Sequence, residues 1–222
     1  MAKKKSASSR KKARKAVSKK RISKKKAVKA AKKKPAKKAA AKAAVKVPVG
    51  KFNMLVTYDP NHRGIAEMEL KEVMKQVGAV PRIAPTEVDG LFKVAVKDSR
   101  KTAVSIATLV MKNPAVFMST HHYTPVDTWV KSEVPAMQQA VKKAADSIGN
   151  SERWKMGLNK RHWNKMDSVP LIIKLTDVIS KQKVDLNNPQ KIVQVEIIGK
   201  EAGVALLKPN ELVDVPRIKA NM

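Results

Sequence analysis

Apolar residues in the segment from 51 to 123 recur with two different periods. Phe52, Met54 and Val56 fall on one side of an extended segment, which indicates a half-buried strand. Between 66 and 77 the apolar residues instead recur at spacings of four, three and four, which places them on one helix face, and Gly78 follows as a stop signal. The first two predicted elements are therefore a strand and a helix.

A further run of elements is predicted up to residue 118. Residues 80–87 form a poorer strand whose prolines place it at a sheet edge, and residues 91–96 form an alternating strand. Asp98 or Ser99 can cap a helix that ends near residue 111, and residues 116–118 supply a last short strand. The complete order of strand, helix, strand, strand, helix and strand is that of a ferredoxin-like fold.

A second set of elements follows residue 124. Apolar spacing predicts, in order, a helix, a strand, a helix and two strands, at 132–148, 154–161, 168–179, 191–198 and 204–207. In the first of these strands apolar residues alternate with basic ones. If that strand is regular, one of its faces packs against the core and the other is basic. The pattern as a whole predicts an α+β chain.

Positive charge is concentrated at the start of the chain. The formal net charge is +30, and by count of the sequence residues 1–46 hold 22 of the 48 Lys and Arg residues and no acidic residue. Such a segment buries too little apolar surface to offset its ordering entropy, so we predict a disordered basic tail. It would bind nucleic acid without sequence preference, because neutralised phosphates release counterions. A solubility tail or a localisation signal is the alternative.

The composition argues against several kinds of site. The chain has no cysteine, which excludes disulfides, thiolate zinc sites and iron–sulfur clusters. His121 and His122 are adjacent, but the sequence offers few other ligands, so we expect exposed loop histidines and no metal site. No phosphate-binding glycine loop, paired carboxylates or nucleophile context is recognisable. We therefore expect no cofactor, and we expect that the chain is not an enzyme.

The sequence also bears on location. It contains neither a membrane-spanning apolar stretch nor a secretory signal segment. We expect a cytoplasmic protein, or a nuclear or nucleolar one in a eukaryote, with no membrane partner.

Three segments of the second half resemble the THUMP domain of RNA-modification proteins. They are Trp154-Lys155-Met156-Gly157-Leu158-Asn159-Lys160-Arg161, Val184-Asp185-Leu186-Asn187-Asn188-Pro189, and the strand pair ending in Ala205-Leu206-Leu207. THUMP domains commonly follow a ferredoxin-like domain. The resemblance therefore implies a ferredoxin-like domain at 51–123 and a THUMP-like RNA-binding domain at 124–215, after the tail at 1–46.

The resemblance also implies a function. Proteins of this kind bind tRNA near its acceptor stem and 3′ end and position it for modification. The architecture is similar to the stand-alone THUMP adaptors that assist an acetyltransferase in forming N4-acetylcytidine. We therefore expect tRNA and a tRNA-modifying enzyme, an acetyltransferase, as partners. A general nucleic-acid-binding or chromatin-like protein that acts through its Lys-rich tail is one alternative, and a ribosome-associated factor is another.

Nine residues are candidate RNA contacts. The resemblance carries the family's basic strand over to Lys155, Lys160 and Arg161 and its Asx-Pro turn to Asn187, Asn188 and Pro189. We add Lys191 and Lys200, which begin the next strand and the last turn, and Trp163, which could stack on a base. Lys and Arg would neutralise phosphates, and Asn amides could reach sugars or base edges. Two alternatives stay open: Asp185 and Asn188 can instead cap the turn, and Trp163 can lie in the core rather than stack on a base.

Overall fold

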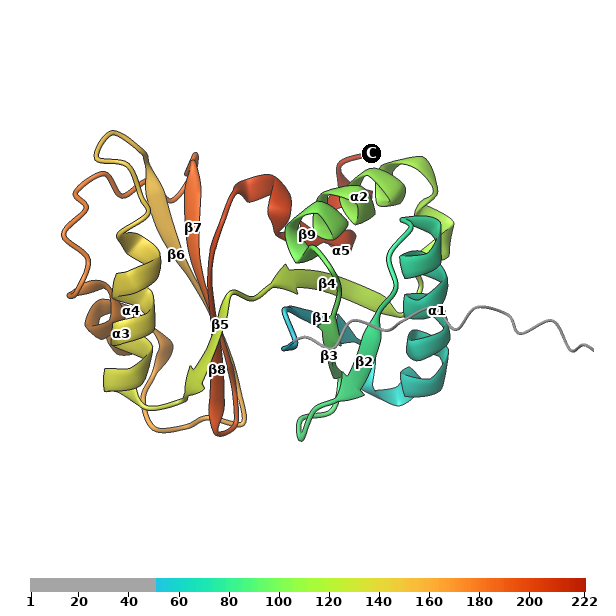
Figure 1. Cartoon of the computed structure of the whole chain (residues 1–222), viewed down its shortest axis with the longest axis horizontal. Helices are drawn as coiled ribbons and strands as arrows, with labels where there is room; N and C mark the ends of the chain where they lie inside the picture. The colour runs from blue at the N-terminus through green and yellow to red at the C-terminus, as the bar shows by residue number, and fades with distance from the viewer. Residues whose placement is uncertain (1–50) are drawn as a thin grey trace, which may run out of the picture. The chain divides into compact units, whose positions relative to one another are not determined.

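The computed structural model describes residues 51–222, so the predicted tail at 1–46 lies outside the described residues. The described chain is a mixed α/β structure with two sheets, which agrees with the predicted α+β class (Figure 1). None of its described helices is long and apolar enough to cross a membrane.

The first sheet has five strands, and every neighbouring pair is antiparallel. Its order is β2-β3-β1-β4-β9. The strands are β1 (Met54–Tyr58), β2 (Arg82–Pro85), β3 (Leu91–Ala95), β4 (Thr120–Pro125) and β9 (Val213–Asp214). The proline-containing strand β2 lies at the edge, as predicted, because proline cannot donate a ladder hydrogen bond.

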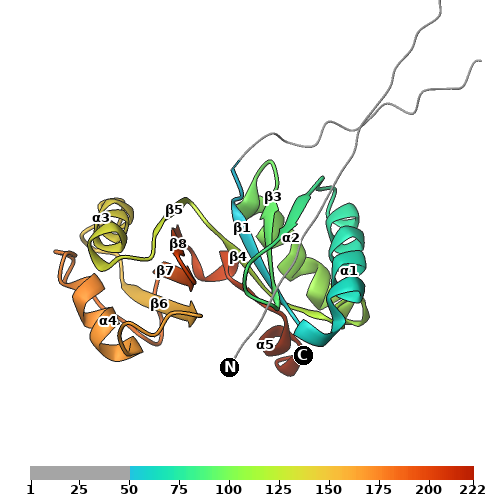
Figure 2. The same cartoon turned by 90° about the horizontal axis from the view of Figure 1, so that it is seen from below.

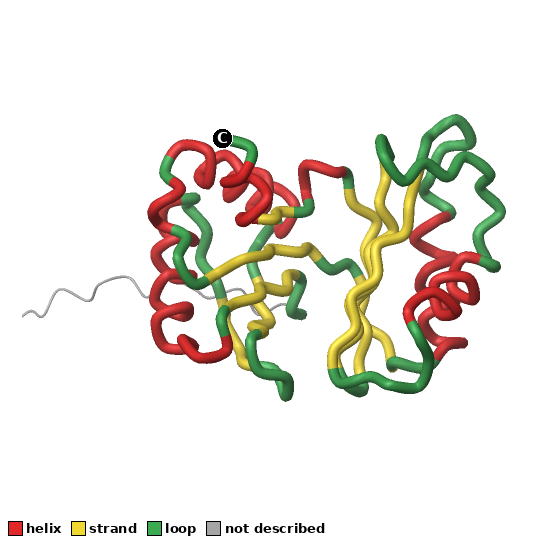
Figure 3. The backbone as a smooth tube through the Cα atoms, turned by 180° about the vertical axis from the view of Figure 1, so that it is seen from behind, coloured by secondary structure: helices red, strands yellow, loops and turns green. Residues whose placement is uncertain are grey.

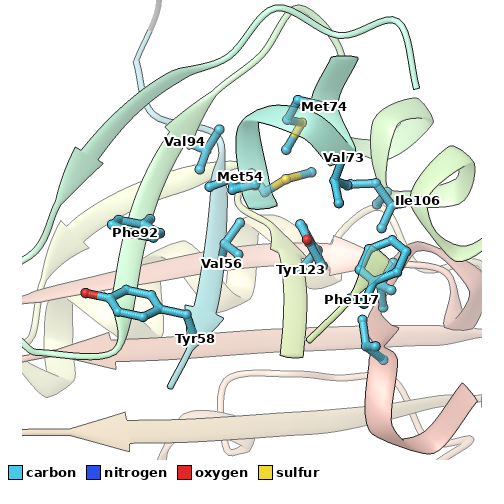
Figure 4. Close-up of a cluster of buried hydrophobic side chains, with 14 of the residues drawn as sticks. Met54, Val56, Tyr58, Val73, Met74, Phe92, Val94, Ile106, Phe117 and Tyr123 are labelled. Carbon is cyan, nitrogen blue, oxygen red and sulfur yellow. The ribbon is translucent and has the colours of Figure 1, made fainter. Parts of the chain in front are cut away.

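Two helices pack on one face of the first sheet (Figure 2). They are α1 (Arg63–Gln76) and α2 (Ser99–Lys112), and both confirm the predicted helices. The side-chain oxygen of Asp98 accepts a hydrogen bond from the Lys101 amide at 3.0 Å, which makes Asp98 the cap of α2. Figure 4 shows the resulting core, in which Met54 and Val56 of β1 meet Val73 of α1 and Ile106 of α2.

The last strand of the predicted ferredoxin-like order begins later than the sequence suggests. Residues Pro114–Val116 form a 3-10 turn, and the strand β4 starts only at Thr120. The expectation of loop histidines is therefore wrong, because His121 and His122 lie within β4. Their polar character conceals the strand, but pairing with β1 on one side and β9 on the other orders it.

The second sheet has the order β5-β8-β7-β6. Its strands are β5 (Thr128–Lys131), β6 (Trp154–Arg161), β7 (Lys191–Ile198) and β8 (Glu201–Leu207). Only the pair β6 and β7 is parallel, as expected for strands joined by the crossover helix α4 (Ser168–Thr176). Helix α3 (Val134–Ala145) and α4 cover the same face of this sheet (Figure 1).

The end of the chain returns to the first sheet. After β8 a short turn at Pro209–Glu211 leads into β9, which pairs with β4, and into the helix α5 (Val215–Ala220) against α2. Two chain crossings therefore join the sheets, one from β4 to β5 and one from β8 to the turn before β9 (Figure 3). The sequence does not predict this return, since β9 has only two residues.

The uncovered faces of the two sheets meet in a small apolar cluster. Leu55 and Leu91 of the first sheet contact Ile198 of the second, together with Val126 of the crossing. Beside the cluster, the Lys93 ammonium pairs with Glu201 and lies 4.4 Å from the centre of the Trp129 ring. These contacts hold the uncovered sheet faces toward each other and leave a polar region farther along them.

Candidate nucleic-acid interface

A cleft of about 490 Å³ lies between the uncovered faces of the two sheets. We call it the intersheet cleft. The first sheet contributes Thr57, His122, Thr124 and Asp214, and the second contributes mainly Lys155, Gly157, Asn159, Arg161, Ile192, Gln194 and Glu196. Because α3 and α4 cover only the other face of the second sheet, side chains of alternate residues on β6 and β7 line this cleft.

Gly157 of β6 makes room for the side chain of Gln194, which lies opposite it on β7. A Cβ atom at position 157 would lie only 2.0 Å from Oε1 of Gln194, so the Gln194 amide occupies the space that any other residue would fill. Gln194 is itself 4% exposed. Packing therefore explains why glycine stands at position 157 of the basic strand.

A buried carboxylate lies next to Gln194. Oε1 of Glu196 accepts hydrogen bonds of 2.8 Å from the amides of both Asn159 and Gln194. Its Oε2 lies 3.5 Å from Nη1 of Arg161, and the Glu196 side chain is 3% exposed. Burial raises the pKa of Glu196, while the two amides and Arg161 act in the opposite direction.

His122 contributes the facing wall of the cleft. Its Nδ1 lies 2.9 Å from the Thr57 hydroxyl, and its Nε2 lies 3.6 Å from a carboxylate oxygen of Asp214. Partial burial lowers the pKa of His122, with His121 and Arg161 acting in the same direction and Asp214 opposing them. No cluster of three or more metal-ligating side chains is found in residues 51–222.

The predicted RNA contacts divide between the two ends of β6. One group lies at its start and comprises Lys155, Asn187, Asn188, Pro189 and Lys191. Trp154 pairs with Lys191 in register and with the backbone around Val184, which brings the Asx-Pro turn to this end. Asn187 and Asn188 are exposed, and both donate backbone N–H bonds to the Asp185 carboxylate.

At the Asx-Pro turn the capping alternative describes Asp185, whose carboxylate accepts both backbone bonds. The backbone N–H of Asn188, with that of Asn187, holds the pKa of Asp185 below its usual value. Asp185 is thus the turn-capping residue. The exposed Asn188 side chain takes no part in the bonds that cap the turn, which use its backbone N–H.

The other group lies at the far end of β6 and comprises Lys160, Arg161, Trp163 and Lys200. Lys200 is exposed in the turn between β7 and β8. Lys160 points to the helix-covered side, where its ammonium donates to the Met166 carbonyl at 2.6 Å. Arg161 faces Glu196, so its charge is already paired within the chain.

Trp163 cannot stack on an unpaired base in this structure. It is 4% exposed and belongs to the core beneath α3 and α4. Its indole N–H donates to the Ser132 carbonyl at 2.9 Å. The core alternative for Trp163 therefore describes its position, because its polar atom already has a buried partner.

The cleft residues that sequence reasoning missed include the polar residues Thr57, His122, Asn159, Gln194, Glu196 and Asp214. One signal was present: Gln194 and Glu196 interrupt the otherwise apolar strand β7 at alternate positions. Two polar residues spaced by two on a buried strand lie on the same face.

The chain is similar to several solved structures at low identity. No protein-family model and no curated protein matches it. The PH1313 protein of Pyrococcus horikoshii is 15% identical, with 70% of this chain and 53% of that one covered and a TM-score of 0.49. TrmN of Thermus thermophilus is 14% identical, covering 71% and 46%, with a TM-score of 0.48.

A third similar structure is a 4-thiouridine synthetase in complex with RNA and ATP. It is 15% identical, with 74% of this chain and 42% of that one covered and a TM-score of 0.43. The chain thus spans about half the length of the structures that it matches.

This comparison corrects one expectation. The matching structures include the synthetase and several proteins described as methylases or methyltransferases. The expectation that the chain is not an enzyme is contradicted by these neighbours. That expectation rested on the absence of catalytic motifs from the sequence. A motif search detects only chemistry that has a recognisable local signature.

Proposed function

We propose that the chain binds RNA in tRNA modification and presents the acceptor stem and 3′ end of tRNA to the modifying chemistry. The observation that carries the proposal is the basic, helix-free face of β6. Lys155 and Arg161 lie on it, and both line the intersheet cleft. Because Arg161 is paired with Glu196, Lys155 is the cation on this face that we expect to meet a phosphate.

The arrangement of elements supports this proposal. The order β2-β3-β1-β4 with α1 and α2 on one face fits the ferredoxin-like domain proposed at 51–123. The succession α3, β6, α4, β7, β8 fits a THUMP-like domain within 124–215. The Asx-Pro turn and the basic strand, which are far apart in sequence, lie beside each other.

Binding of full-length protein to three nucleic acids tests the proposal. The ligands are intact tRNA, tRNA without its single-stranded 3′ end, and duplex DNA, at about 150 mM salt, where exposed charges are well screened. We expect preference for intact tRNA. Equal affinity for all three would overturn the proposal and favour non-specific binding through residues 1–46.

Removing one cation from the face of β6 should weaken this binding selectively. We expect Lys155→Ala to weaken tRNA binding several-fold and to reduce the salt slope by roughly one counterion, because one phosphate contact is lost. The matched control is Lys142→Ala, which removes the same charge from the last turn of α3 on the covered side. Titrations at several salt concentrations measure both quantities, and equal effects of the two changes would remove the basic face from the site.

We further propose that the modifying chemistry is cytidine N4-acetylation, carried out with a partner acetyltransferase. The architectural resemblance to stand-alone THUMP adaptors supports this step. N4-acetylcytidine in tRNA from cells with and without the gene provides the test. We expect the modified nucleoside to disappear without the gene, and an unchanged level would reject acetylation as the chemistry.

A further inference from the structure

We propose that the intersheet cleft accepts one unpaired RNA base, whose edge is read by Glu196 with Asn159 and Arg161. The inference rests on the proposed function in that the nucleotide belongs to bound RNA. It goes further in assigning a base-reading site to polar side chains of the second sheet that line the cleft.

The first support is the pair formed by Oε2 of Glu196 and Nη1 of Arg161, which can each take part in a further hydrogen bond. Oε1 of Glu196 receives both amide donors, which leaves Oε2 with Arg161 Nη1 at 3.5 Å as its partner. That Nη1 atom is buried and makes no hydrogen bond with any described residue. One acceptor and one donor therefore lie side by side. The pairing edges of the nucleobases present adjacent donors and acceptors in different orders, so a fixed pair of this kind can match one base better than the others.

The second support is the mixed character of the walls. Apolar side chains of Ile192, Leu186 and Leu212 line the cleft beside the polar group, which suits the faces of a planar ring. Lys155 also lines the cleft and supplies a cation for the phosphate attached to the base. The volume of about 490 Å³ lies within the range of roughly 300–1,000 Å³ that small-molecule sites occupy.

The third support is that the cleft is preorganised. Gly157 admits the Gln194 amide, Gln194 holds Glu196, and Asn159 holds the same carboxylate oxygen from β6. These bonds fix Oε2 of Glu196, the oxygen that faces Arg161, in one orientation. A fixed polar group rejects a base that cannot pair with it, because the unpaired group stays buried.

The test compares short single-stranded RNAs of equal length made only of A, C, G or U. Their phosphates are equivalent, so differences in affinity for the full-length chain arise from the bases. We expect the wild-type chain to prefer one base by roughly tenfold, the range of a good pair of hydrogen bonds to a base edge. Glu196→Gln replaces one acceptor oxygen by a donor and should change which base is preferred. Binding to tRNA should stay within a few-fold, since phosphates dominate it.

Matched variants keep the result interpretable. Glu72→Gln makes the same chemical change on the exposed face of α1 and should leave base preference unaltered. Asn159→Ala provides a second reading if Glu196→Gln fails to fold, because Asn159 is exposed, and it should reduce the preference several-fold. A wild-type chain without base preference, or variants with the wild-type preference, would overturn the inference while tRNA binding stands.

The source of the nucleotide is tested in the same experiment. Free nucleoside monophosphates should compete poorly with the preferred oligomer, because they lack the neighbouring phosphates. Full competition at low concentrations would replace RNA by a free nucleotide as the ligand and overturn the inference. Absence of any tRNA binding would instead reject the proposed function itself.

Discussion

Replacing Trp163 with alanine should lower the free energy of unfolding by about 3–5 kcal/mol, the cost of truncating a large buried aromatic side chain. Trp163 is 4% exposed within the core of the second sheet, and its indole N–H is bonded to the Ser132 carbonyl. The change therefore leaves both a cavity and an unpaired carbonyl. For a chain of this size the melting temperature should fall by roughly 6–20 °C.

Thermal melts of three proteins separate packing from RNA contact. Trp163→Phe keeps most of the apolar volume and loses the N–H donor, so its melting temperature should lie between those of wild type and Trp163→Ala. Its affinity for tRNA should equal that of wild type. A Trp163→Ala protein with unchanged stability and weakened tRNA binding would show that the ring is available to a base, contrary to its buried position.

Long elements were predictable because buried apolar residues recur at regular spacing along them. Helix α1 shows this, since Ala66, Leu70 and Val73 all lie in the core and define its buried face without reference to other elements. Strand β6 was predictable for the same reason, through Trp154 and the apolar residues at alternate positions after it. Local periodicity is sufficient when an element packs one continuous stripe.

Short elements were not predictable, because tertiary pairing orders them. Strand β9 has two residues and depends on hydrogen bonding to β4, which lies some 90 positions earlier in the chain. Strand β5 directly follows the chain crossing after β4, and it pairs with β8, which is distant in the sequence. Neither segment contains enough residues to show a period, so only the three-dimensional partner identifies it.

The candidate site was predictable in its charges and not in its geometry. Lys155 and Arg161 were identified from the basic strand, but the sequence could not indicate that Arg161 meets a buried Glu196. That pairing depends on the parallel register of β6 and β7, which aligns Asn159 with Glu196. It also means that Arg161→Ala should affect folding as well as RNA binding, which makes Lys155→Ala the cleaner test.

Glu69 shows how a single polar side chain can stabilise the junction before β4. Its carboxylate accepts backbone N–H bonds from Met118 at 2.9 Å, Ser119 at 2.7 Å and Thr120 at 2.9 Å. These bonds connect α1 to the segment before β4, where the sequence wrongly predicted a strand at 116–118. The three backbone N–H groups at the entry to β4 need acceptors, and the Glu69 carboxylate supplies them.

Glu69→Ala should therefore lower the free energy of unfolding by about 2–4 kcal/mol, since hydrogen bonds to a charged group contribute about 1.5–3 kcal/mol each and part of the loss is recovered by water. Urea denaturation measures the change. Glu67→Ala is the matched control on the same helix, where the carboxylate forms an exposed pair with Lys71 at 2.6 Å. Exposed pairs contribute at most about 1 kcal/mol. Equal destabilisation by the two changes would mean that the Glu69 bonds do not hold β4, because of the two carboxylates Glu69 alone accepts hydrogen bonds from that segment.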